Sequence, residues 1–246
     1  ARYHGDRLVP VDTTHTDIRG RIRFETSNLR PGQYRLVFGK GNGTDFLFHH
    51  QPVNLQFDIP TGTTLFADTL NEDYQQMLVK EDENRKKLSL LENLLDEYPR
   101  DDPFYQKITA QYVKQQIDHS AYLSGLIRRH HTDLLGRMAR MMKKPFTAPE
   151  LDQKGRSLYQ REHFWDLNEI DDTTLIATNI YPRRAIEFLT LYSNPEYTKD
   201  ELQAAFIQGI EAMLPHISHN QRVFDFVMEY LIGGFEQFGF EEVIQY

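Results

Sequence analysis

The fold of this chain is decided by residues 88–113, LSLLENLLDEYPRDDPFYQKITAQYV. Leucines recur here at helical steps up to Tyr98, two prolines interrupt the pattern, and a second helical pattern follows. Apolar residues at this spacing form a stripe along one side of a helix. Asp102 can cap a new helix, with Pro103 at its first position. The segment therefore predicts a turn between two helices.

The same spacing extends in both directions, from Leu70 to Lys144. Its members are Leu70, Tyr74, Met77, Leu78, Leu88, Leu91, Leu94, Leu95, Tyr98, Phe104, Ile108, Tyr112, Leu123, Leu126, Ile127, Leu134, Leu135, Met138 and Met141. We expect antiparallel helices over Leu70–Tyr98 and from Phe104 to about Arg129, because a short proline-bounded connection leaves little alternative.

Two further expectations concern the sides of this helical hairpin. Its inner side is predicted to bury Leu91, Leu94, Leu95, Ile108 and Tyr112. The run from Lys80 to Lys87 is almost wholly charged. Charged side chains are rarely buried, so this part of the first helix should project into solvent.

Residues before the hairpin follow a period of two, which is typical of strands. Val53–Ile59 alternates strictly and is ended by Pro60. Alternation also predicts one strand with Tyr34, Leu36 and Phe38 on one face and an earlier one with Ile22 and Phe24, joined by a turn at Arg30-Pro31-Gly32. Gly39 to Gly43 should turn the chain into Phe46-Leu47-Phe48. The result is a small antiparallel meander that is one or two strands short of a sandwich.

Residues after the hairpin predict further helices. A break is expected near His130 to Asp133, where Thr132 can cap a short helix to Lys143, and the next helix should run from Glu150 to about Phe164. The following segment, Thr174–Tyr192, must hold Pro182 in its first turn or be split by it.

Two helices are predicted near the end of the chain. Thr198 and Glu201 form a capping box for a helix through Met213 that should end before Pro215. Gly239 is placed to cap the last long helix, whose apolar members are Val223, Phe226, Val227, Tyr230, Leu231 and Phe238. The predicted fold class is thus α+β, with an antiparallel β-sandwich-like domain over residues 1–67 and an all-helical domain over residues 68–246.

Composition narrows the classes of function. The chain has 246 residues, a formal net charge of −8 and no cysteine. Such an acidic balance gives no reason to expect nucleic-acid binding. Without cysteine the chain forms no disulfide, thiolate nucleophile or cysteine-ligated zinc site. No apolar run approaches the roughly 20 residues of a membrane helix. No signal peptide is visible, which is expected of a mature or trimmed form.

Motifs that carry chemistry are weak throughout. The glycines at residues 39–43 are followed by a strand, whereas a phosphate loop needs a helix whose N-terminus faces the anion. His216 and His219 have no third ligand at metal-binding spacing. His49 and His50 point to opposite faces if they lie on a strand.

The charged clusters also have ordinary explanations. The one basic concentration comprises Arg128, Arg129, His130, His131, Arg137, Arg140, Lys143 and Lys144, and it fits either an anionic partner or a solvated helix face. Acidic pairs at 101–102 and 171–172 stand at helix starts, where capping accounts for them. No nucleophile elbow is present. We therefore predict no catalytic, cofactor-binding or metal-binding residue, and no cofactor.

Several phrases together resemble one family. They are Phe24 with Leu29–Leu36, then Tyr98–Tyr105, His163–Asp166 and Phe226–Leu231. The first is similar to the closing hairpin of a small β domain at the N-terminus of TlpA-like thioredoxin-fold proteins of the Gram-negative cell envelope. The others resemble phrases of the helical segment that follows it. The resemblance covers most of the chain, but its phrases are structural signals that carry no chemistry.

In that family a thioredoxin-like domain with a Cys-x-x-Cys motif follows and performs thiol–disulfide exchange. This chain has no cysteine, so no catalytic residue can be carried over to it. The resemblance implies a non-catalytic region of a periplasmic or envelope protein, secreted or lipid-anchored, that binds substrate proteins, positions the redox domain or dimerises. The ending at Tyr246 favours a piece of a longer chain. The alternative is a stand-alone envelope binding module.

The family's β domain also opens with strands that precede the region matching Leu8 to Phe24. Here only residues 1–17 are available for such strands, and they lack a second alternating run, so an edge of the sheet is expected to lack its neighbour. Either the N-terminal arm covers this edge or a second copy pairs with it to make a homodimer, and we favour the second.

Overall fold

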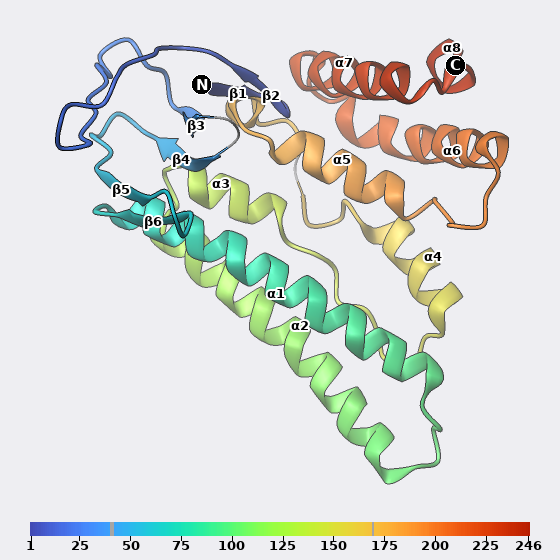
Figure 1. Cartoon of the computed structure of the whole chain (residues 1–246). Coiled ribbons are helices and arrows are strands. Elements are labelled where there is room, and N and C mark those ends of the chain that lie inside the picture. The colour runs from blue at the N-terminus through green and yellow to red at the C-terminus, as the bar shows by residue number, and fades with distance from the viewer. Residues whose placement is uncertain (40–41, 169) are drawn as a thin grey trace.

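The computed structural model describes residues 1–39, 42–168 and 170–246 and has the predicted α+β class (Figure 1). A four-stranded antiparallel sheet has the order β2-β1-β3-β4, and a separate two-stranded hairpin pairs β5 with β6. The strands are β1 (Arg2–His4), β2 (Arg7–Val9), β3 (Gly32–Phe38), β4 (Asn42–Phe48), β5 (Leu55–Asp58) and β6 (Thr63–Phe66). Of the turn predicted at residues 39–43, Lys40 and Gly41 lie outside the described residues.

The predicted hairpin between Ile22 and Phe24 on one side and β3 on the other is wrong. Both residues lie outside any strand, and β1 pairs with β3 instead. The backbone N–H of Arg35 donates to the Ala1 carbonyl at 2.9 Å, and the Ala1 amino group donates to the Arg35 carbonyl at 2.9 Å. The edge of β3 is thus covered by the N-terminal arm, the first of the two outcomes expected, and β2 becomes the outer strand.

The helical hairpin is confirmed. Helices α1 (Thr69–Glu97) and α2 (Pro103–Arg129) lie side by side in Figure 1, with the connecting turn at the far tip of the molecule. Asp68 caps α1, and the Asp102 carboxylate caps α2 by accepting from the backbone N–H of Phe104 at 2.7 Å. These local signals need only neighbouring residues, so the sequence places both helix starts correctly.

The predicted burial of Leu95, Ile108 and Tyr112 is confirmed, and that of Leu94 is wrong. Leu95 is 2% exposed and packs with Ile108 and Tyr112, whereas Leu94 is 39% exposed. Leu91, also expected inside, is only partly buried. Consecutive leucines point about 100° apart around a helix, so only contact with α2 decides which of two neighbours faces inward.

The charged middle of α1 is not wholly solvated, contrary to the prediction. Glu81 and Asn84 are 4% and 5% exposed. The Glu81 Oε1 atom lies 2.6 Å from Nε2 of His119, and the Gln115 side-chain amide donates to Asn84 at 2.8 Å. Two polar partners on α2 thus compensate for the lost hydration of these groups.

The remaining regular elements of the described chain are helices. Its elements are α3 (Leu134–Met141), α4 (Gln153–His163), the 3-10 helix η1 (Thr173–Ala177), α5 (Ile180–Thr190), α6 (Lys199–Ile217), α7 (Gln221–Phe238) and the short α8 (Glu241–Gln245). The expected single helix at residues 174–192 is split into η1 and α5, with Pro182 in the first turn of α5. The capping box at Thr198 and the left-handed cap at Gly239, with φ +65°, are confirmed.

Three helix ends differ from prediction. Asp133, not Thr132, caps α3, because its carboxylate accepts from the N–H groups of Leu135 and Gly136. Helix α4 begins after the cap Asp152 rather than at residue 150. Helix α6 continues through Pro215 to Ile217. Ile217 is 1% exposed, so its burial holds the last turn despite the missing proline N–H.

The sheet and the helices share one core. Leu47 of β4 is fully buried in the same apolar cluster as Leu123, Leu135, Met138, Phe188, Met213 and Val223. Buried amides join the layers as well: Gln33 donates to the Tyr74 hydroxyl at 3.1 Å and accepts from the backbone N–H of Asn179 at 2.9 Å. These contacts cross the boundary between residues 67 and 68, and the division into two domains there stays a prediction.

Candidate functional site

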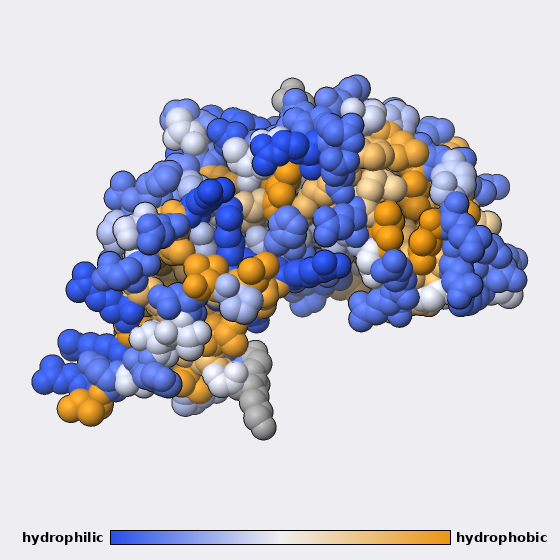
Figure 2. All heavy atoms as spheres, turned by 90° about the horizontal axis from the view of Figure 1, so that it is seen from above, coloured by the Kyte–Doolittle hydropathy of each residue, from blue (hydrophilic) through white to orange (hydrophobic). Residues whose placement is uncertain are grey.

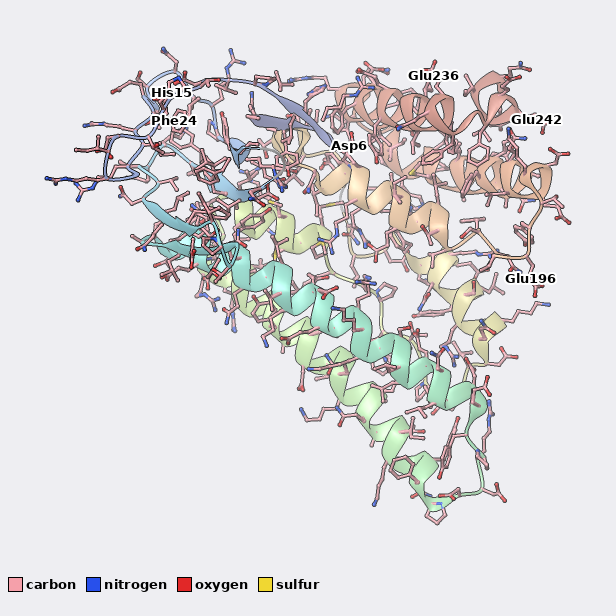
Figure 3. All side chains as sticks on the ribbon, viewed as in Figure 1. Asp6, His15, Phe24, Glu196, Glu236 and Glu242 are labelled. Carbon is pink, nitrogen blue, oxygen red and sulfur yellow. The ribbon has the colours of Figure 1, made fainter. Side chains whose placement is uncertain are left out.

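A surface groove of about 430 Å³ lies between β2 and α7. Among the described residues it is lined by Arg7, Phe224, Asp225, Met228, Glu229, Ile232, Gly233 and Glu236. Figure 3 shows Asp6, in the turn between β1 and β2, beside α7, and Glu236 farther along that helix. The site therefore combines the beginning of the chain with a helix near its end.

The β1–β2 turn holds the groove together. Gly5 has φ +68°, a conformation that favours glycine. A Cβ added there would lie 3.4 Å from Pro182 and 3.5 Å from Phe226, so the turn packs closely on α5 and α7. The His4 ring meets the Phe226 ring edge to face at 5.2 Å. These contacts fix Arg7, three residues beyond His4, next to α7.

Helix α7 has one wide apolar face, with a buried inner part and a more exposed outer edge. The inner face joins the core through Val223, Phe226, Val227, Leu231 and Phe235. An outer stripe is formed by Phe224 and Met228, which are partly buried, and by Ile232, which is 40% exposed. In Figure 2, apolar side chains gather among hydrophilic ones over the C-terminal helices. Phe224 and Met228 also pack on the edge of the core, so only part of their surface, together with Ile232, is left for another molecule.

The rim of the groove is acidic. Asp225, Glu229 and Glu236 are exposed around it, and Arg7 is the one cationic residue among the described lining. Arg7 Nη1 lies 3.8 Å from Glu229, and both side chains are 63% exposed. A pair this long and this exposed contributes little to stability. The groove is therefore an apolar strip with an acidic border and a loosely held guanidinium.

A second, polar pocket of about 220 Å³ lies over the sheet and includes Arg35, Thr44, Asp45 and Gln75. The Tyr3 hydroxyl donates to Asp45 at 2.8 Å, and Arg35 donates to the same carboxylate at 3.3 Å. Burial raises the pKa of Asp45, and the bonds from Tyr3 and Arg35 offset only part of that effect. The charges here satisfy one another, which fits a tie between β1, β3 and β4.

Helix α5 carries a buried cation. Arg184 is 0% exposed, donates to Glu187 at 2.7 Å and stacks over the Phe164 ring at 4.0 Å. Burial lowers the pKa of Arg184. Its Nε and Nη2 groups have no partner among the described residues, and neither has the indole N–H of Trp165. Lys144 also binds Glu187, so a network of two cations and one carboxylate ties α5 to the segment after α3.

This network predicts acid sensitivity. Burial by itself raises the pKa of Glu187, but the charges of Lys144 and Arg184 outweigh it and bring that pKa to about 2. The pKa of a glutamate in an unfolded chain is about 4.3. Between these values the unfolded chain binds a proton that the folded chain does not, so stability rises with pH. The contribution is complete above about pH 4.5 and is lost as the pH falls toward 2.

We expect the stability advantage of the wild type over Glu187→Gln to shrink by about 1 kcal/mol between pH 7 and pH 3.5. Urea unfolding of both proteins at both pH values measures it. An advantage that stays constant with pH would contradict the ion network.

Half of the basic concentration singled out in the sequence lies beside carboxylates. Arg129 pairs with Asp73, Arg137 with Asp172 and Lys144 with Glu187, and His130 lies 2.8 Å from both Asp73 and Asp133. Burial raises the pKa of Asp73, but the hydrogen bonds from His130 and Arg129 outweigh it and lower that pKa. Arg129 and His130 thus join the end of α2 to α1 and α3, whereas Arg128, His131 and Arg140 remain exposed.

The other candidates do not form a site either. His216 lies in the last turn of α6 near Trp165, with its pKa lowered by burial. His50 has φ +59° at the end of β4. The described residues contain no group of three His, Cys, Asp or Glu side chains that could hold a metal ion. Asn42 of β4 pairs with Phe38 of β3, as in a β-hairpin.

Sequence reasoning missed the groove. Phe224, Met228 and Ile232 repeat at steps of four, a signal that was readable as a second apolar stripe on α7. Nothing local, however, connects that stripe with Arg7. Within the described part of the chain, no helix is both long and apolar enough to cross a membrane.

Comparison with protein-family models, with curated proteins and with solved structures finds no match to this chain. The resemblance to TlpA-like proteins therefore rests on the sequence phrases alone and stays a prediction.

Proposed function

We propose that this chain is a non-catalytic, protein-binding region of a thioredoxin-like thiol–disulfide oxidoreductase of the cell envelope. The observation that carries the binding role is the groove on α7, with its apolar stripe and acidic rim. Apolar patches bordered by polar residues mark sites of protein association. The thioredoxin-like context is supported by the sequence phrases that resemble TlpA-like proteins.

The chemistry of the groove favours binding over catalysis. Its described lining holds carboxylates, an arginine and apolar side chains, and includes no serine, cysteine or histidine. The carboxylates are exposed on the rim, whereas a catalytic acid or base is usually tuned by burial. A role in holding a substrate protein near a separate redox centre is consistent with this lining.

The stand-alone envelope binding module is the second candidate, and the same groove supports it. The reading frame downstream of the codon for Tyr246 distinguishes the two. A thioredoxin-like domain with Cys-x-x-Cys in that frame would support the accessory role. A stop codon directly after Tyr246 would overturn it in favour of the stand-alone module. Fractionation of the cells that make the protein tests the envelope location for both.

The purified chain is expected to show no disulfide reductase or oxidase activity. Thiol–disulfide exchange needs an attacking thiolate, and the chain contains no cysteine. Insulin reduction followed by turbidity, with thioredoxin as the positive control, measures it. Turnover above the rate of the reductant alone would contradict the prediction.

A further inference from the structure

We infer that the α7 groove binds an amphipathic helix of a partner protein whose apolar residues are flanked by lysine or arginine. The inference rests on the proposed function only in that the groove is taken as a protein-binding surface. Three properties of the groove define this partner: the spacing of its apolar stripe, the low surface at Gly233 and the sign of its charge.

The spacing comes from α7 itself. Phe224, Met228 and Ile232 follow one another at steps of four residues, which places them about 6 Å apart along the helix axis. A second helix with apolar residues at the same step presents a matching ridge. Apolar grooves recognise amphipathic helices through apolar side chains at such regular spacing.

Gly233, which lines the groove, leaves room for a backbone. A Cβ added to it would meet only the Arg7 guanidinium, at 2.9 Å. The surface of α7 is therefore low next to Ile232, and the atom above it belongs to a flexible, exposed side chain. A partner helix can approach closely here once Arg7 moves aside.

The charge decides between partners. Asp225, Glu229 and Glu236 lie along the solvent side of the stripe, and the guanidinium of Arg7 is also in the groove, 3.8 Å from Glu229. Its loose pair with Glu229 shows that the groove accepts a cation and that little is lost when another replaces it. A second copy of this chain would bring the same three carboxylates to the interface, and an anionic membrane would add negative charge. Both oppose association, whereas a basic helix is attracted.

The test uses the whole chain and fluorescein-labelled synthetic 15-residue helical peptides. One peptide carries leucines on one face and lysines beside them; the second has glutamate in place of lysine; the third is a scrambled version of the first. Fluorescence anisotropy should show saturable binding of the basic amphipathic peptide. The acidic and scrambled peptides should bind at least tenfold more weakly.

Two groove variants and their controls assign the site. Met228→Gln should weaken binding about tenfold, and Leu90→Gln, at a 65% exposed position of α1, should leave it unchanged. Asp225→Lys with Glu236→Lys should also weaken it about tenfold and shift the preference toward the acidic peptide. Glu97→Lys with Asp101→Lys makes the same change in net charge at the exposed tip of the hairpin. This control should change neither the affinity for the basic peptide nor the preference between peptides. Circular dichroism confirms that each variant is folded.

Equal binding of all three peptides, or of the basic peptide to the groove variants and the wild type, would overturn the inference. So would a dimer in sedimentation that Met228→Gln dissociates, because the occupant would then be a second copy. None of these outcomes depends on the reading frame after Tyr246 or on insulin turnover, so the accessory role can fail while the inference holds.

Discussion

Replacing Leu95 with alanine is expected to lower the free energy of unfolding by about 2–5 kcal/mol, the range for a buried leucine. Leu95 is 2% exposed and fills the space between Ile108 and Tyr112 in the outer half of the hairpin. The truncation removes apolar burial and leaves a cavity that two long helices cannot easily close. Denaturant unfolding followed by circular dichroism measures the loss.

The neighbouring position provides the control. Leu94 is 39% exposed, so Leu94→Ala should cost only about 1 kcal/mol or less. The two substitutions delete the same atoms from adjacent residues of one helix, so helix propensity changes equally. Equal losses, or a larger loss at Leu94, would show that the hairpin packs in the other register.

A Gly136→Ala substitution is expected to destabilise the protein by about 1–3 kcal/mol or more, as overpacking of a rigid site does. A Cβ at this position would lie 1.9 Å from the carbonyl oxygen of His130. The obstacle is backbone, so no side-chain rotation relieves it. Helix α3 would have to move away from the end of α2, where His130 is held by Asp73 and Asp133.

Gly125→Ala is the matched control within α2. An added Cβ there finds only the end of the Arg129 side chain, at 3.9 Å. Alanine is a better helix former than glycine by about 1 kcal/mol, so this variant should be slightly more stable than the wild type. Thermal melting of both variants gives the two signs directly. Stabilisation by Gly136→Ala would contradict the close contact between α2 and α3.

Several helix ends can be located from local signals in the sequence. Asp102 with Pro103, Thr198 with Glu201, and Gly239 mark helix ends through residues that lie within one turn of each other. Such signals act before any tertiary contact forms, and they place the hairpin and the C-terminal helices close to where the structure has them.

Only part of the candidate site could be predicted from the sequence. The outer stripe on α7 is a local pattern, so its spacing is visible in the sequence. Arg7 completes the groove from the opposite end of the chain, through a turn that packs on Pro182 and Phe226. No periodicity links two segments so far apart, so the groove itself was not predictable.

The sequence by itself therefore determined the α+β class, the helical hairpin and the caps at Asp102, Thr198 and Gly239, because each depends on a few contiguous residues. Tertiary structure alone decided that Leu95 rather than Leu94 faces inward and that Glu81 is buried against His119. It alone decided that the N-terminal arm, not residues 22–24, pairs with β3. These outcomes depend on which distant side chain or strand edge is within reach, and the free energy of that contact exists only once the chain has folded.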